Sequence, residues 1–297
     1  MSTAVPPLTI ANRTFDWGSR TYVMGILNIT PDSFSGDGLE SGADSLYRAL
    51  SQAERFATAG ADILDVGGES TRPGAAPVSA EEEKQRVIPV IKAITSELDI
   101  PVSIDTYKAE VAAAALDAGA HLVNDVWAFR ADPELAALVA ERGVPVILMH
   151  NRSNPANADL REKLGGRYIG VEYGNLIEDI KRELMESVEI GKKAGIENNS
   201  IILDPGIGFG KTVEQNLELL DRCGELRDLG YPLLVGPSRK SFIGYTLDLP
   251  PDQRVEGTAA AVAIAIARGA DIVRVHDVEE MLRVVKMTDA IVRKTKA

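Results

Sequence analysis

Carboxylate and amide side chains follow several of the apolar stretches that we expect to form strands. Asp105, Asn124 and Asp204 each stand at the end of such a stretch. Their oxygens accept hydrogen bonds, so together they suit a flat heterocycle that is rich in N–H donors. An aspartate after a strand can instead cap the next helix. Capping remains open for Asp105, whereas Pro205, directly after Asp204, suits capping less.

Basic side chains gather at the ends of the last two expected strands, in a chain whose formal net charge is −12. Arg274 and His276 are two residues apart on the last strand, so their side chains share one face. The strand before it leads into Ser238, Arg239 and Lys240. Positive charge gathered in this way in an acidic protein predicts an anionic substrate.

Asn28 ends the first expected strand, with Asp32 close behind it. Oxygen ligands of this kind suit Mg²⁺, which usually bridges from one or two protein groups to substrate phosphates. We therefore expect a magnesium site at Asn28. His150 also ends a strand, where it either lines the site or packs, while His121 precedes its strand and is expected to be structural.

Two features are similar to a phosphate-binding loop and to a catalytic cysteine, but each lacks a residue that such a site needs. GIGFGKT (206–212) is similar to a phosphate-binding loop, but Pro205 stands where that loop needs its first glycine. The single cysteine, Cys223, has no paired general base, which favours a buried thiol. One cysteine also excludes a disulfide framework and a cysteine-based metal site.

A scaffold must bring the ends of these strands together. Three similar segments, ending at residues 66, 126 and 275, each read as a helix end, a glycine and a strand. Eight alternating strand and helix units favour a (β/α)8 TIM barrel, in which chemistry lies at the carboxyl ends of the strands. The expected strands are 23–28, 63–66, 102–105, 122–125, 146–149, 201–204, 233–236 and 272–275.

The remaining segments complete this expected fold. Residues 8–17 are predicted to form an extra N-terminal β-hairpin that turns at 11–13. The polar stretch 151–167 is predicted to be a long loop, followed by a helix over 174–194. No segment is typical of a flexible linker, so we expect one domain over residues 1–297.

Composition narrows the class of protein. The 297 residues are 45% hydrophobic and 26% charged, as in a globular protein with an ample core. With 32 Lys+Arg against 44 Asp+Glu, nucleic acid and anionic membranes are not expected partners. No apolar run approaches the ~20 residues that span a bilayer, and no secretory signal is evident. We expect a cytoplasmic protein.

Seven segments resemble the motifs of the dihydropteroate synthases, which are pterin-binding barrel enzymes, and they occur in that family's order. The resemblance implies a (β/α)8 barrel that joins a (7,8-dihydropterin-6-yl)methyl diphosphate to 4-aminobenzoate in tetrahydrofolate biosynthesis, releasing diphosphate with Mg²⁺ as cofactor. The segments are MGILNITPDSFSGDG (24–38), DILDVGGESTRPGA (62–75), VSIDT (102–106), VND (123–125), LDPGIGFGK (203–211), GPSRKSFIG (236–244) and IVRVHDV (272–278).

The same resemblance implies a role for each matching residue. The positions that match the pterin diphosphate site are Thr71, Asp105, Asn124, Asp204, Lys240, Arg274 and His276. The positions that match the aminobenzoate site are Arg72, Pro73, Phe209 and Ser238. Asn28 matches the metal site, and the catalytic positions are Asp105, Lys240, Arg274 and His276.

The implied mechanism uses no protein nucleophile. Magnesium, Arg274 and His276 absorb the charge of the departing diphosphate, Asp105 favours the cationic methylene group, and the neutral arylamine then attacks. The resemblance also implies a homodimer formed through barrel helices remote from the site, with the Ala-rich segment 258–268 as a candidate, and sulfonamides as competitive inhibitors.

Two departures and two alternatives accompany this reading. The first loop reads SFSGDG where the family often has an extra glycine after Asp, and the segment after the Met149-His150 pair is longer than in many relatives. One alternative is a corrinoid methyltransferase on a related barrel, but such an enzyme does not need the Ser-Arg-Lys motif or the Arg274–His276 pair, and both are present here. The other alternative is a catalytically silent pterin-binding paralogue. Such a protein is expected to lose the residues that bind diphosphate, whereas Asn28, Arg274 and His276 are all present here.

Overall fold

The computed structural model describes residues 5–30, 42–71 and 75–294, with the backbone alone for 42–44. Within it eight parallel strands lie side by side in chain order, and a parallel bridge between Leu203 and Leu233 joins the two ends of the row. The strands are β3 (Tyr22–Asn28), β4 (Ile63–Gly67), β5 (Val102–Asp105), β6 (Leu122–Asp125), β7 (Val146–Met149), β10 (Ile201–Asp204), β11 (Leu234–Val235) and β12 (Ile272–Val275).

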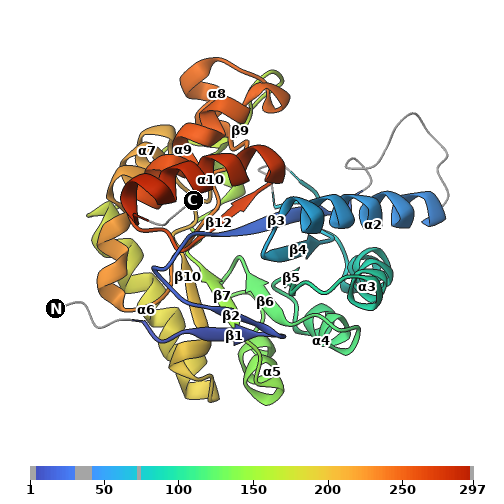
Figure 1. Cartoon of the computed structure of the whole chain (residues 1–297). Helices are drawn as coiled ribbons and strands as arrows, with labels where there is room; N and C mark the ends of the chain where they lie inside the picture. The colour runs from blue at the N-terminus through green and yellow to red at the C-terminus, as the bar shows by residue number, and fades with distance from the viewer. Residues whose placement is uncertain (1–4, 31–41, 72–74, 295–297) are drawn as a thin grey trace.

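Helices surround this barrel, and at least one follows every strand (Figure 1). They are α2 (Gly42–Ala59), α3 (Ala80–Glu97), α4 (Ala109–Asp117), α5 (Glu134–Arg142), α6 (Leu176–Ala194), α7 (Val213–Arg222), α8 (Ser241–Leu247), α9 (Val255–Ala267) and α10 (Val278–Val292). The predicted (β/α)8 barrel is therefore confirmed. In the described part of the chain, no helix is both long and apolar enough to cross a membrane.

The three similar segments share one local geometry. Gly60, Gly119 and Gly269 have φ of +109°, +104° and +99°, and each ends a helix just before a strand. Only glycine adopts this backbone conformation without strain, which explains the repeated Gly-Ala pattern.

The N-terminal hairpin closes one end of the barrel. Strands β1 (Leu8–Ile10) and β2 (Arg13–Phe15) pair antiparallel around a turn at residues 11–12, as predicted. Ile10, Phe15 and Trp17 are buried in one apolar cluster with Tyr22 and the inward-facing residues at the amino ends of the strands.

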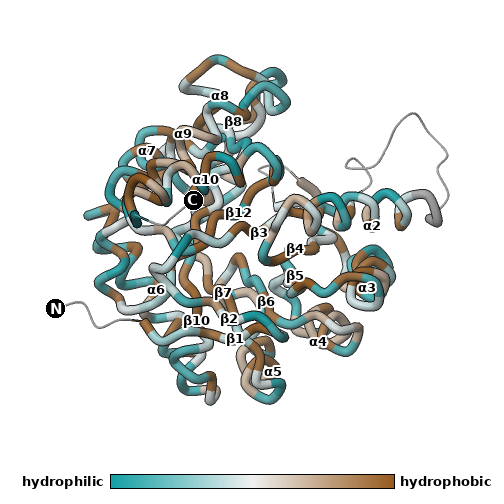
Figure 2. The backbone as a smooth tube through the Cα atoms, viewed as in Figure 1, coloured by the Kyte–Doolittle hydropathy of each residue, from teal (hydrophilic) through white to brown (hydrophobic). Residues whose placement is uncertain are grey.

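The barrel interior changes from apolar to polar along each strand. Alternate residues of a strand face the same side, so a residue two positions further on also points inward. Four strands thereby replace an apolar inward residue by a polar one, in the pairs Ile63 and Asp65, Leu122 and Asn124, Ile202 and Asp204, and Ile272 and Arg274. Figure 2 shows the hydrophobic strands inside helices whose colour alternates along their length.

The segment after β7 differs from the predicted long loop. It holds a single 3₁₀ turn, η1 (Pro155–Asn157), and an antiparallel hairpin, β8 (Ala158–Arg161) and β9 (Gly165–Tyr168). Polar strands without an apolar alternation carry no periodic signal, which explains the wrong prediction. The hairpin packs on α8, where the guanidinium groups of Arg161 and Arg167 lie over the Tyr245 ring.

Candidate active site

Four side chains from four strands meet inside the mouth of the barrel. Arg274 donates from Nε to Asp65 Oδ2 at 2.5 Å and from Nη2 to Asp105 Oδ2 at 2.5 Å. Asn124 Nδ2 donates to the same Asp65 oxygen at 3.0 Å. The structure therefore brings together Asp105, Asn124 and Arg274, all predicted from sequence, around an aspartate to which no role was assigned.

Burial sets the charges of this cluster. Burial raises the pKa of the Asp105 carboxyl to about 7, although Arg274 opposes the shift. Burial likewise raises the pKa of Asp204. Burial alone would lower the pKa of Arg274, but Asp65 and Asp105 raise it, so the guanidinium stays charged. The mouth therefore holds a fixed cation beside two carboxyls whose pKa values are raised, that of Asp105 to about 7.

The loop after β10 supplies a second wall. Asp204 Oδ1 accepts a hydrogen bond from the Gly206 amide at 2.7 Å, and Lys240 Nζ donates to the Ile207 carbonyl. The same ammonium lies 4.5 Å from the centre of the Phe209 ring. Burial lowers the pKa of Lys240 to about 8, with Asp204 opposing the shift. The predicted residues Asp204, Phe209 and Lys240 therefore share one wall.

Ser238 and His276 form a contact between β12 and the loop after β11. Ser238 Oγ accepts from the His276 amide at 3.2 Å and lies 3.0 Å from His276 Nδ1. Beside it, Arg239 Nε donates to Asp277 Oδ2 at 2.9 Å. These neighbouring contacts hold the Ser-Arg-Lys segment against the end of the strand that carries Arg274.

Several alternatives from the sequence can now be decided. Asp105 pairs with Arg274, and the N-cap of α4 is Lys108, so Asp105 does not cap that helix. His121 Nδ1 accepts from the Val102 amide at 3.1 Å, at the amino end of β5, in agreement with its structural assignment. Cys223 is buried, as predicted.

The remaining predicted residues lie on the first two loops. Asn28 is half-buried at the end of β3, opposite Gly67 of β4, and Thr71 is exposed after β4. Arg72 and Pro73, predicted for the aminobenzoate site, lie outside the described residues, as does Asp32.

The metal prediction meets a limited donor set. Among residues 5–30, 42–71 and 75–294 no group of three His, Cys, Asp or Glu side chains could hold a metal ion. A single amide oxygen at Asn28 fits Mg²⁺ only where substrate phosphates and water supply the other ligands, which is how Mg²⁺ is commonly held.

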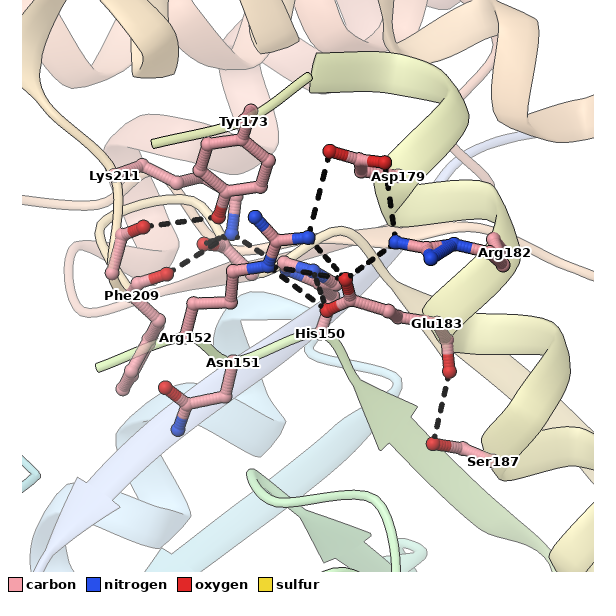
Figure 3. A network of polar contacts seen from close by, with 12 residues as sticks. His150, Asn151, Arg152, Tyr173, Asp179, Arg182, Glu183, Ser187, Phe209 and Lys211 are labelled. Atoms are coloured by element: carbon pink, nitrogen blue, oxygen red, sulfur yellow. Dashed lines mark hydrogen bonds and ion pairs between the residues drawn. The ribbon is translucent and has the colours of Figure 1, made fainter. Parts of the chain in front are cut away.

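Sequence reasoning missed two buried ionisable residues near the mouth, Asp65 and Lys211, and left open whether a third, His150, lines the site or packs. Asp65 is completely buried, and its Oδ1 atom has no hydrogen-bond partner. Lys211 and His150 are each 2% exposed, and they contact one another next to Glu183 of α6 (Figure 3). The period-two step from Ile63 to Asp65 was the one available signal for Asp65, and Lys211 was set aside with an incomplete phosphate-loop motif.

The fold and the site together define a class of protein. A barrel mouth with buried carboxyls, an amide, a lysine and an arginine suits an enzyme that binds an N–H-rich heterocycle with an anionic group. The Pterin binding enzyme family matches residues 24–276. A dihydropteroate synthase of Clostridium beijerinckii is 51% identical, over 97% of this chain and 100% of that protein. The chain belongs to the pterin binding enzyme family and, within it, to the dihydropteroate synthases.

Solved structures agree with this assignment. A Xanthomonas albilineans dihydropteroate synthase with 4-aminobenzoic acid superposes with a TM-score of 0.86 at 41% identity, covering 97% of this chain and 98% of that one. A Yersinia pestis dihydropteroate synthase in a sulfonamide drug complex gives 0.87 at 43% identity, covering 98% and 100%.

Proposed function

We propose that this chain condenses (7,8-dihydropterin-6-yl)methyl diphosphate with 4-aminobenzoate and releases diphosphate. The observation that carries the proposal is the cluster in which Arg274 bridges Asp65 and Asp105 beside Asn124. This cluster supports the proposal because it combines hydrogen-bond acceptors that suit the pterin ring with a fixed cation that suits the diphosphate.

The proposed mechanism follows from the charges of these residues. Asp105, Asn124 and Asp204 accept hydrogen bonds from the N–H and amino groups of the pterin, and Lys240 donates to its acceptors. Arg274 and His276 stabilise the negative charge that develops on the leaving diphosphate. The Asp105 carboxylate stabilises the cationic methylene group, which the neutral arylamine attacks. No side chain forms a covalent bond, so catalysis consists of positioning and charge stabilisation.

We assign Mg²⁺ to Asn28 and the substrate diphosphate, where the metal would neutralise phosphate charge. The half-buried amide at the end of β3 supports this assignment. Asn28→Ala should raise the Mg²⁺ concentration needed for half-maximal turnover, while leaving the KM for 4-aminobenzoate unchanged. An unaltered Mg²⁺ requirement would contradict the assignment.

We assign 4-aminobenzoate to the wall formed by Phe209 and the Ser238 loop, together with Arg72 and Pro73, which lie outside the described residues. The structure of a relative with 4-aminobenzoic acid and that of another in a sulfonamide drug complex support this assignment and sulfonamide inhibition. A sulfonamide should therefore compete with 4-aminobenzoate and not with the dihydropterin diphosphate in steady-state inhibition kinetics.

We further propose a homodimer formed through α9 and α10. Helix α9 is apolar around most of its circumference, which is typical of a helix buried on all sides. Yet Ile264 of α9 is 45% exposed, and Met287 and Ile291 of the neighbouring α10 are 63% and 65% exposed. An exposed apolar area of this kind is expected to be covered by a partner, and a second copy is the simplest one.

The test of the proposed function is the product. The purified protein, given both substrates and Mg²⁺, should form dihydropteroate, detected by chromatography. A silent paralogue would bind the dihydropterin diphosphate in calorimetry and form no dihydropteroate, which would contradict the proposal.

A further inference from the structure

Lys211 is a buried lysine that the proposed mechanism does not use. Its ammonium group contacts three acceptors, namely His150 Nδ1 at 2.9 Å, the Gly206 carbonyl at 2.9 Å and the Phe209 carbonyl at 3.0 Å. Two of the three belong to the loop after β10, so one side chain holds both ends of the turn that presents Phe209.

The backbone of this loop excludes a side chain at its glycine positions. Gly206, Gly208 and Gly210 all have positive φ, of +71°, +83° and +62°. An added Cβ atom would stand 1.8 Å from the His150 carbonyl oxygen at Gly206 and 2.1 Å from the Arg152 carbonyl carbon at Gly210. The loop is therefore packed directly on the segment that contains His150 and Arg152.

His150 connects Lys211 to helix α6. Its Nε2 atom lies 3.0 Å from Glu183 Oε2, while Nδ1 faces Lys211 (Figure 3). A carboxylate only accepts, so Nε2 carries the hydrogen and donates to Glu183. Burial and the nearby Lys211 lower the pKa of His150 to about 3, so the imidazole is neutral and Nδ1 accepts from Lys211 Nζ, whose own pKa burial lowers well below its usual value. The tautomer of His150 is thereby determined by its two partners.

Glu183 completes the series of contacts. Arg152 Nε lies 3.1 Å from both carboxylate oxygens of Glu183, and the Arg152 guanidinium covers the Tyr173 ring at 4.1 Å. The Tyr173 hydroxyl in turn donates to the Gly210 carbonyl at 3.0 Å. The contacts therefore return to the same loop, and every charged member has an opposite charge or an acceptor beside it.

We propose that Lys211, His150 and Glu183 act as positioning residues for the 4-aminobenzoate site, by holding the loop of residues 205–210 and the Phe209 ring in place. The inference rests on the proposed function and on the assignment of Phe209 to the aminobenzoate wall. Asp204 lies on β10 itself and Lys240 on another loop, and each makes one hydrogen bond with the 205–210 loop, at the Gly206 amide and the Ile207 carbonyl. We therefore expect a smaller effect on the dihydropterin diphosphate than on 4-aminobenzoate.

The test uses substitutions that separate contact from volume. Glutamine can place Oε1 and Nε2 where histidine has Nδ1 and Nε2, whereas leucine makes neither contact. Lys211→Met and His150→Leu should raise the KM for 4-aminobenzoate about tenfold, the loss of one hydrogen bond to a charged group. The KM for the dihydropterin diphosphate should stay within about threefold. His150→Gln should restore the wild-type KM for both substrates.

A control and a milder variant keep the test decisive. Glu178→Gln changes an exposed glutamate of the same helix, whose side chain pairs only with Lys181 among described residues, and should leave both KM values unchanged. If the two core variants do not fold, Glu183→Gln at the partly exposed end should still raise the aminobenzoate KM about threefold.

The outcomes separate this inference from the proposed function. Folded variants with an unchanged aminobenzoate KM would overturn the positioning role. So would a His150→Gln variant that is as impaired as His150→Leu. In either case, turnover by the wild-type protein would still support the proposed function. A wild-type protein that forms no dihydropteroate would overturn both.

Discussion

Arg274 of β12 reaches past the intervening β3 to Asp65 of β4, with Nε and Oδ2 2.5 Å apart. Asp65 is completely buried and also receives the Asn124 amide, so one carboxylate orients a side chain proposed for the diphosphate and another proposed for the pterin. The relationship fixes the register between the residues proposed for the diphosphate and those proposed for the pterin.

Asp65→Asn should therefore damage catalysis more than stability. The carboxamide keeps the volume but loses the charge that opposes Arg274, and kcat/KM for the dihydropterin diphosphate should fall about 30-fold. Asp271→Asn is a matched control, because Asp271 is equally buried, has one unpartnered oxygen and pairs with Arg227 away from the mouth. Equal effects of both substitutions on kcat/KM would argue against the role of Asp65.

Asp105→Asn and His121→Gln compare the two ends of the barrel. Asp105 is proposed to stabilise the cationic methylene group, so its loss should lower kcat about 100-fold or more. His121 accepts one backbone hydrogen bond at the amino end of β5, so His121→Gln should leave turnover nearly unchanged. Steady-state turnover of the two variants measures this directly. A larger loss of turnover in His121→Gln than in Asp105→Asn would place the active site at the amino ends of the strands and contradict the account.

The two shifted pKa values predict a narrow optimum for kcat/KM of the dihydropterin diphosphate. Asp105, with a pKa of about 7, is protonated and neutral below that pH, so activity should rise as it ionises. Lys240, with a pKa of about 8, loses its charge above that pH, so activity should fall again. Lys240→Arg should remove the alkaline decline, since arginine stays protonated. A flat profile across both pKa values would refute these charge states.

Ile264→Glu should convert the proposed dimer to a monomer. The substitution places a charge among the exposed apolar side chains of α9 and α10. Leu160→Glu, on the β8–β9 hairpin, is the control, since Leu160 is 61% exposed and lies on a different surface. Light scattering on both variants measures their oligomeric state. A dimeric Ile264→Glu protein would exclude this surface as the dimer interface.

Much of this arrangement could be predicted because it is periodic. The strand ends at Asp105, Asp125 and Asp204 were predicted to the residue, since apolar runs with polar residues at one end define parallel barrel strands. The glycine after each repeated helix end was predicted from its backbone requirement.

The parts that were missed depend on contacts between distant segments. The partnership of Lys211 with His150 and Glu183 joins two loops and a helix, and no local pattern encodes it. The β8–β9 hairpin has polar strands without an apolar alternation. Its Arg161 and Arg167 pack on the ring of Tyr245, which is distant in the sequence. Asp65 looked like one of many polar residues at a strand end until its partners were visible.

The most direct test of the central claim is diphosphate release by the purified protein with dihydropterin diphosphate and Mg²⁺, with and without 4-aminobenzoate. The account predicts sustained release only when the amine is present, matched mole for mole by dihydropteroate. Absence of release despite tight binding of the dihydropterin diphosphate would contradict it.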